Sequence, residues 1–251
     1  MVRDAELITS LTSLALYRRR DLLWVAALAG LLIHSGWPAD ADDRLGPQTF
    51  PAPDRPVAGI VSPEYSDEPT RDGHGEADRV LDRLDIKAPL RVADIGAGLG
   101  YYTVRLVRRL GAGATIYATD VKAEYLDQLR ARLAREGITG VTLILGSPRD
   151  PRLPPDSVDV AILSHMYHEI ENPYEFLYRL HSSLATGARV GIIDMDRPTK
   201  QHGTPPSLLR CELAAVGYRQ IDLVSLDPAD GYLAVFVRPD TLPPAIRACR
   251  Q

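Results

Sequence analysis

The sequence predicts an α/β fold: a doubly wound, mostly parallel seven-stranded sheet whose last strand is antiparallel. Three observations predict it. Apolar extended runs alternate with helical repeats from Gly73 onward, and a glycine cluster follows the first run. The last two runs are joined by Asp227–Gly231, a connection too short for a parallel crossover, which indicates a hairpin. A chain of 251 residues, 45% hydrophobic and 25% charged, is ordinary for a globular protein and excludes collagen-like, coiled-coil and wholly disordered classes.

The first half of the predicted domain alternates helix and strand. The helices show apolar residues on one stripe, whereas the strands are short apolar runs, the first of them ending in glycines. The third strand is rich in β-branched residues and leucine, which suits a buried position. In order, we expect helix 77–84, strand 90–95, helix 101–110, strand 115–119, helix 125–135 and strand 141–145.

The second half repeats this alternation and then changes it. Gly217 is expected to close the last helix, and the two runs that follow form the closing hairpin. In order, we expect strand 158–163, helix 173–184, strand 188–194, helix 207–216 and strands 221–226 and 232–237.

Residues 1–41 are expected to be a secretory signal peptide. Leu22–Ile33 is a long uncharged apolar run, Arg18–Arg20 place positive charge before it, and Ala39–Ala41 offers a small-x-small cleavage pattern. The run is too short to cross about 30 Å of hydrocarbon, so we expect no stable membrane span after cleavage. The prediction is therefore a periplasmic or secreted protein, with a cytoplasmic location as the alternative.

Residues 42–72 are expected to be a proline-rich linker that ends in a lid or a solvated connector. The domain then spans 73–238, and 239–251 form a loose tail. Cys211 and Cys249 are the only cysteines, and Cys249 lies in that tail. We therefore expect neither a disulfide scaffold nor a cysteine-built zinc site, although such a pair can bridge in an oxidising compartment.

A glycine loop of the pattern D-x-G-x-G-x-G, Asp94–Gly100, follows the first strand. Its glycines allow positive φ and let a ligand approach bare backbone at the carboxyl end of the sheet. Asp120 closes the second strand, where a carboxylate accepts hydrogen bonds from ribose hydroxyls. The nicotinamide fingerprint G-x-G-x-x-G/A fails, because Tyr101 or Thr103 stands at its third glycine.

This arrangement resembles motifs I and II of the class I S-adenosylmethionine-dependent methyltransferases, over about residues 73–237. The resemblance implies S-adenosylmethionine as cofactor, with Asp94 at its ammonium group, Asp120 at its ribose and Val121 against its adenine. An acidic residue often follows the third strand in this family, but here Gly146 and Ser147 do. The expected cofactor-binding residues are Asp94, Gly96, Ala97, Gly98, Gly100, Asp120, Val121, Ser147 and Ser164.

The fourth strand ends in a polar segment that runs from Ser164 to Glu169. The resemblance implies that this segment faces the cofactor's methyl group. His165 and His168 are the candidate general bases for an acceptor that must lose a proton; local packing is the alternative for each. No metal is expected from His165, His168 and Glu169. The order HxxHE is neither HExxH nor HxxEH, and a third ligand would have to come from elsewhere.

The expected acceptor is a small molecule. Aromatic residues make up only 6% of the chain, the net charge is −4, and no Asn/Asp-Pro-Pro-Tyr motif follows the fourth strand, so nucleic acid is not expected. Two alternatives stay open: a methyltransferase-like cofactor-binding protein without transferase activity, and an NAD-dependent oxidoreductase. The sequence leaves the oligomeric state open.

Overall fold

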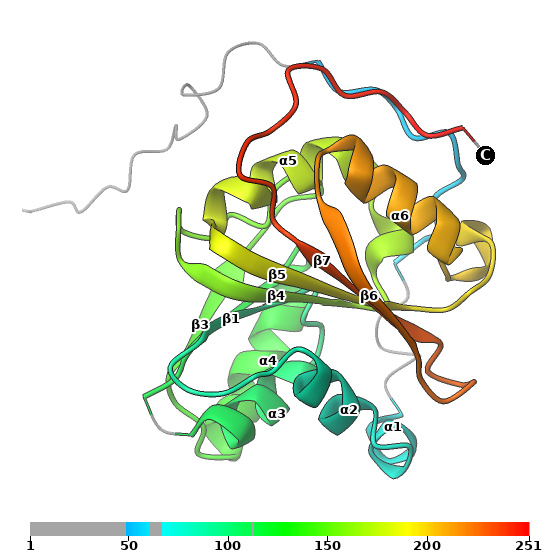
Figure 1. Cartoon of the computed structure of the whole chain (residues 1–251). Helices are drawn as coiled ribbons and strands as arrows, with labels where there is room; N and C mark the ends of the chain where they lie inside the picture. The colour runs from blue at the N-terminus through cyan, green and yellow to red at the C-terminus, as the bar shows by residue number, and fades with distance from the viewer. Residues whose placement is uncertain (1–48, 61–66, 112, 251) are drawn as a thin grey trace, which may run out of the picture. The chain divides into compact units, whose positions relative to one another are not determined.

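The computed structural model describes residues 49–60, 67–111 and 113–250, so the predicted signal peptide lies outside the described residues. Within this part of the chain one sheet has the strand order β3-β2-β1-β4-β5-β7-β6 (Figure 1). Only β7 runs antiparallel to its neighbours, which confirms the predicted fold class. The strands are β1 (Arg91–Ile95), β2 (Thr115–Asp120), β3 (Val141–Leu145), β4 (Val158–Ser164), β5 (Leu184–Asp194), β6 (Arg219–Ser225) and β7 (Tyr232–Val237).

Helices cover both faces of the sheet. In Figure 1, α2, α3 and α4 lie on one side, and α5 and α6 lie on the other. Central strands β1 and β4 are therefore buried on both faces, as their continuous apolar runs require. The α-helices are α1 (Glu68–Gly73), α2 (Glu76–Arg83), α3 (Tyr101–Leu110), α4 (Ala123–Arg135), α5 (Pro173–Ser183) and α6 (Pro206–Ala215); short 3₁₀ turns occupy η3 (Tyr167–Glu169) and η4 (Thr199–Gln201).

Residues 49–60, the first described part of the expected proline-rich linker, are packed on the domain through two side chains. The Arg55 side chain is buried, and its Nε donates to Glu212 Oε1 of α6 at 2.9 Å. Phe50 packs edge-on against Tyr178 of α5, with ring centroids 5.2 Å apart. The prolines give this segment an extended course, but the two side chains between them anchor it.

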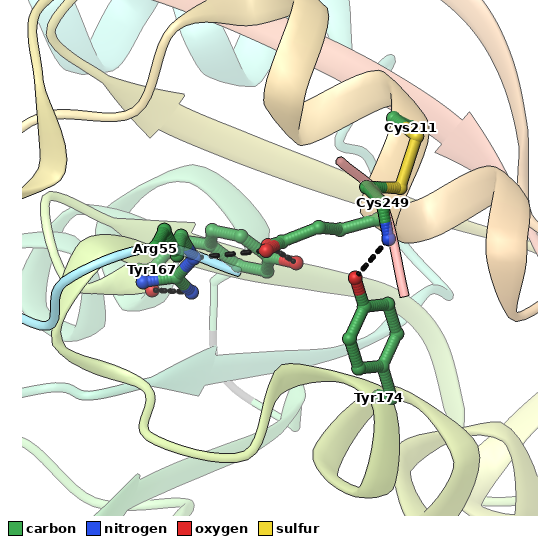
Figure 2. The surroundings of a disulfide bond; sticks show 6 residues. Arg55, Tyr167, Tyr174, Cys211 and Cys249 are labelled. Atoms are coloured by element: carbon green, nitrogen blue, oxygen red, sulfur yellow. Dashed lines mark hydrogen bonds and ion pairs between the residues drawn. A yellow bond between two sulfur atoms is a disulfide. The ribbon is translucent and has the colours of Figure 1, made fainter. Parts of the chain in front are cut away.

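Residues 239–250 are also packed on the domain, which corrects the expectation of a loose tail, and the two cysteines form the bridge that the sequence left open. Cys249 forms a disulfide with Cys211 of α6, and its amide donates to the Tyr174 hydroxyl of α5 at 2.8 Å (Figure 2). Ile246 is buried in the same core as α5 and α6. This apolar anchor carries Cys249 to α6, a contact that the spacing of the two cysteines does not reveal.

Candidate active site

Two adjoining depressions lie at the carboxyl end of the parallel strands. The larger cleft, about 950 Å³ with its open mouth, is lined by the loops after β1, β4 and β5. The smaller one, about 420 Å³, lies at the ends of β2 and β3. Because both are lined by Gly96 and Glu169, they meet at the glycine loop. This is the edge at which open α/β sheets bind their ligands.

The glycine loop has the backbone that its sequence predicts. Gly96, Gly98 and Gly100 all have positive φ, at 71°, 52° and 88°. A Cβ at Gly96 would stand 2.8 Å from Met166 Cγ, so only a bare backbone fits there. Gly100 has another use: it precedes α3, a Cβ on it would collide with Leu129, and it lines neither depression.

Two buried carboxylates flank the loop, one in each depression. Asp120 accepts hydrogen bonds from the amides of Gly98 and Lys122, each at 2.9 Å, and burial raises its pKa. Asp94 is 2% exposed and accepts from the Thr103 hydroxyl at 2.6 Å. Burial raises the pKa of Asp94 to about 6. The loop therefore lies between two carboxylates, each of which can accept further hydrogen bonds from a ligand.

The remaining predicted cofactor residues divide between the two depressions. Ala97, Gly98 and Ser164 line the larger cleft together with Asp94. Val121 and Ser147 line the smaller one with Asp120. The structure thus gathers the predicted residues, apart from Gly100, around one continuous surface.

Both predicted histidines line the larger cleft, in different surroundings. His165 has its Nε2 4.0 Å from Glu76 Oε1, and burial lowers its pKa against the opposing effect of that carboxylate. His168 is only 3% exposed, with Nδ1 2.9 and 3.1 Å from the two carboxylate oxygens of Asp194. Burial therefore favours the neutral form of His165, whereas His168 is held in place by a buried carboxylate.

Helix α1 forms one wall of the larger cleft. Arg71 donates from Nε and Nη2 to both carboxylate oxygens of Glu76, each at 2.6 Å, and from Nη2 to Ser164 Oγ at 3.0 Å. Its guanidinium carbon lies 3.6 Å from the Tyr101 ring centroid. Glu76 is fully buried and also accepts from the Tyr102 hydroxyl at 2.7 Å. A charged cluster thus supports the strand end that carries Ser164.

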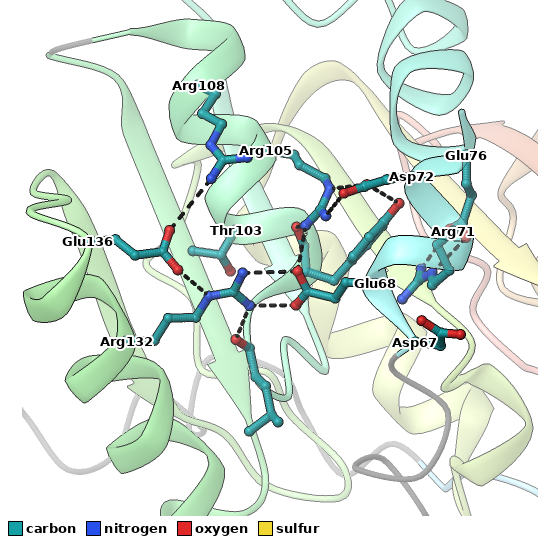
Figure 3. A network of polar contacts seen from close by, with 12 residues as sticks. Asp67, Glu68, Arg71, Asp72, Glu76, Thr103, Arg105, Arg108, Arg132 and Glu136 are labelled. Carbon is teal, nitrogen blue, oxygen red and sulfur yellow. Dashed lines mark hydrogen bonds and ion pairs between the residues drawn. The ribbon is translucent and has the colours of Figure 1, made fainter. Parts of the chain in front are cut away.

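A second set of ion pairs ties α1 to α3 and α4 (Figure 3). Glu68 accepts from Arg132 at 2.5 and 2.9 Å and from Arg105 at 3.2 Å. Arg132 also donates to the Leu99 carbonyl at 2.9 Å, and Asp72 pairs with Arg105. Through these contacts α1, which falls in the segment expected to be a lid or connector, is joined to the glycine loop.

Sequence reasoning missed several polar residues that line the larger cleft or support it, among them Asp194, Glu76, Arg197 and His202. Asp194 ends β5 at the same edge of the sheet as Asp120. An acidic residue at the carboxyl end of a parallel strand was the signal that located Asp120, and the same signal could have located Asp194. Glu76, Arg197 and His202 carried no such signal, because a helix and an irregular loop bring them in from outside the sheet.

Among the residues that the structure describes, no helix combines the length and apolar character needed to span a membrane.

Comparison with known proteins agrees with this geometry. Residues 92–187 match a family model described as a methyltransferase domain. A solved S-adenosylmethionine-dependent methyltransferase from Aquifex aeolicus superposes with a TM-score of 0.64 at 21% identity, covering 71% of this chain and 98% of that one. This likeness shows the fold.

Curated relatives match a shorter part of the chain. An uncharacterized methyltransferase of Mycobacterium tuberculosis is 33% identical over 45% of this chain and 43% of its own length. A trans-aconitate 2-methyltransferase of Rhodopseudomonas palustris is 32% identical over 51% of this chain and 46% of its own. The chain therefore spans less than half the length of these relatives.

The strand order, the glycine loop and the family match over residues 92–187 together indicate a class I S-adenosylmethionine-dependent methyltransferase domain. The family and fold indicate S-adenosylmethionine as the cofactor. The residues fit this group, because the cradle at Gly96 has room only for bare backbone and an acidic side chain stands on either side of it.

Proposed function

We propose that this protein transfers a methyl group from S-adenosylmethionine to a small-molecule acceptor. The observation that carries the proposal is the glycine loop held between Asp94 and Asp120, with the larger cleft, its histidines and Ser164 directly beside it. Trans-aconitate and nocamycin methyltransferases among the relatives, whose names state small-molecule acceptors, support the acceptor class.

Each depression suits one part of the cofactor. Asp120 retains acceptor capacity for ribose hydroxyls, and Val121 offers apolar surface to the adenine in the smaller depression. Asp94 offers a carboxylate to the ammonium group in the larger cleft. When bound, S-adenosylmethionine supplies a methyl group on a positively charged sulfur. The protein's own contribution is then to hold the acceptor in line with that group, which accounts for much of the rate in such displacements.

His165 is the proposed general base. Its lowered pKa keeps the imidazole neutral near pH 7, so that it can accept a proton from a hydroxyl of the acceptor. Glu76, 4.0 Å from Nε2, then stabilises the imidazolium that results. Ser164 sits beside it at the end of β4, held by Arg71.

The test is turnover with methyl-labelled cofactor and a mixture of small carboxylic acids and phenols. We expect label in a small product, loss of most of this rate in His165→Ala, and little change in His181→Ala, a histidine bonded to the Pro239 carbonyl away from the cleft. Binding of S-adenosylhomocysteine without transfer to any acceptor would favour the cofactor-binding protein. Binding of NADH instead would favour the oxidoreductase.

We also propose that the protein works in an oxidising compartment outside the cytoplasm. The Cys211–Cys249 disulfide supports this, since such bonds persist in secreted and periplasmic proteins and are rare in the cytosol. Cell fractionation with N-terminal sequencing tests it. We expect a mature form that begins near residue 42 outside the cytoplasm; an intact Met1 in the soluble cytoplasmic fraction would contradict the proposal.

A further inference from the structure

The loops after β4 and β5 bring three side chains that can bind a metal together in the larger cleft. His168 and Glu169 lie on η3, and His202 directly follows η4. One ligand atom from each lies within 4.8 Å of the other two, and all three residues line the cleft. The sequence alone offered two neighbouring ligands and no third. The fold supplies the third from the loop after β5.

A buried carboxylate orients the first of these ligands. Asp194 is fully buried, and both its oxygens lie within 3.1 Å of His168 Nδ1. A carboxylate on one imidazole nitrogen fixes the tautomer in which the other nitrogen carries the free lone pair. This is the arrangement that stands behind metal-bound histidines in many proteins. His168 is therefore set with Nε2 as its donor atom.

The same carboxylate holds the loop that carries His202. Thr204 donates from Oγ1 to Asp194 Oδ2 at 2.7 Å, and its amide donates to the Met195 carbonyl at 2.9 Å. These bonds hold the loop, two residues after His202, against the end of β5. The rings of His168 and His202 then meet edge to face, with centroids 5.5 Å apart. One buried residue thus positions both imidazoles.

We propose that His168, Glu169 and His202 bind a divalent first-row transition-metal ion, with Asp194 as the positioning residue. Two imidazoles and one carboxylate are a donor set used for zinc and for iron(II), with zinc bonds of about 2.0–2.2 Å. Glu169 and His202 are half-buried on short turns, so rotation of their side chains brings the donor atoms to that distance.

Three protein ligands leave a coordination position that opens into the cleft. An oxygen or sulfur donor of the methyl acceptor fits this position, where a metal ion lowers the acceptor's pKa. Only this last statement rests on the proposed function. The metal site itself depends on no cofactor.

A second group, His74, Asp227 and Asp230, provides an internal control. It contains one imidazole and two carboxylates, and its His74 Nδ1 lies 3.2 Å from Asp230 Oδ1. No buried carboxylate outside the group orients His74 in the contacts that the structure describes. Removal of His74 therefore measures zinc binding at a cluster that has no outside carboxylate behind its imidazole.

The experiment is calorimetric titration of the chelator-treated, full-length, disulfide-bonded protein with Zn²⁺, with Co²⁺ visible absorption as a second readout. We expect one tight equivalent, kept in His74→Ala and lost in His202→Ala and Glu169→Gln. Asp194→Asn should weaken binding by roughly 10- to 100-fold, and circular dichroism checks that each variant is folded. Should Asp194→Asn not fold, the other two variants decide.

Equal Zn²⁺ affinity in wild type, His202→Ala and Glu169→Gln would overturn the inference, and so would the absence of a tight site in wild type. Binding of S-adenosylhomocysteine is measured separately on metal-free protein. Zinc binding without nucleoside binding supports the metal site and contradicts the proposed function. Nucleoside binding without zinc binding contradicts the metal site and supports the proposed function.

Discussion

The Asp120 carboxylate accepts a hydrogen bond of 2.9 Å from the Gly98 amide, which joins the end of β2 to the loop after β1. The residue proposed to bind the ribose therefore also holds the loop that approaches the cofactor.

Asp120→Ala should weaken binding of S-adenosylhomocysteine by roughly 10- to 100-fold, the usual worth of hydrogen bonds to a charged group. The variant removes both the ribose acceptor and the support of the loop. Calorimetry at pH 7.5 measures the effect, and Asp78→Ala, an exposed position on α2, is the control. An unchanged Kd in Asp120→Ala would exclude this carboxylate from the site.

Gly98→Val should abolish binding of S-adenosylhomocysteine while the fold persists. A β-branched residue at a φ of 52° is strained by about 1–3 kcal/mol, and its side chain blocks the loop. Gly137→Val is the matched control, because Gly137 has a similar φ of 66° but open space around it, at the end of α4. The control should lose comparable stability and keep its affinity. Equal affinities in the two variants would count against the proposed pocket.

Affinity for S-adenosylhomocysteine should depend on pH through Asp94. Its pKa of about 6 means that the carboxyl is mostly neutral at pH 5 and mostly charged at pH 7. A cationic ammonium group favours the charged form, so affinity should rise roughly tenfold from pH 5 to pH 7 and flatten above. In Asp94→Asn this rise should disappear. Calorimetry across the range measures it, and an identical pH profile in both proteins would contradict the assignment.

The same raised pKa has a consequence for stability. The native state binds the Asp94 proton more tightly than the unfolded chain does, so this group makes the protein less stable as pH rises from about 4 to 6. Asp94→Asn should remove that decline. Urea unfolding of the two proteins at pH 4.5 and 7 shows whether the difference between them changes with pH in this direction.

Arg55→Ala should cost about 3–5 kcal/mol, because it leaves the fully buried Glu212 without its cation. Arg130→Ala, which breaks the exposed pair with Asp127, is the control and should leave the Tm nearly unchanged. The double variant Arg55→Met with Glu212→Gln should recover part of the loss. If Arg55→Ala unfolds at the wild-type Tm, residues 49–60 do not belong to the folded domain.

Removing the disulfide with Cys211→Ser should destabilise the protein by about 2–4 kcal/mol, since the bond closes a loop across a separation of 38 residues. Wild type treated with reductant should unfold at the same urea concentration as the variant. The variant itself should not respond to reductant. Two free thiols in native protein purified without reductant from the cells that produce it would contradict the bond and remove the support for an oxidising location.

The sheet could be predicted closely because local sequence determines it. Strands β3 and β7 and helix α3 have the predicted bounds, since their apolar runs end at turn residues. The expectation that the third strand is buried is wrong, because β3 lies at the edge of the sheet and is partly exposed. The glycine loop and Asp120 could be located for a related reason. The carboxyl ends of parallel strands meet at one edge, so residues distant in sequence are placed together by topology.

The parts that could not be predicted depend on contacts between segments without periodic patterns. An arginine in a proline-rich stretch is expected to be solvated, and only the structure shows that Arg55 donates a hydrogen bond to Glu212. The sequence around Cys249 predicts a loose tail, and only the structure shows that the neighbouring Ile246 is buried in the core. His202 stands in an irregular loop, and its position beside His168 follows from Asp194. Only three-dimensional packing reveals these pairings.

The measurement that tests the central claim most directly is titration of purified wild-type protein with S-adenosylhomocysteine, followed by calorimetry and by thermal shift. Saturable binding of one nucleoside per chain, with a rise in Tm, is the result expected from the paired depressions around Gly96. A well-folded protein that shows neither heat nor stabilisation at saturating nucleoside would contradict the account.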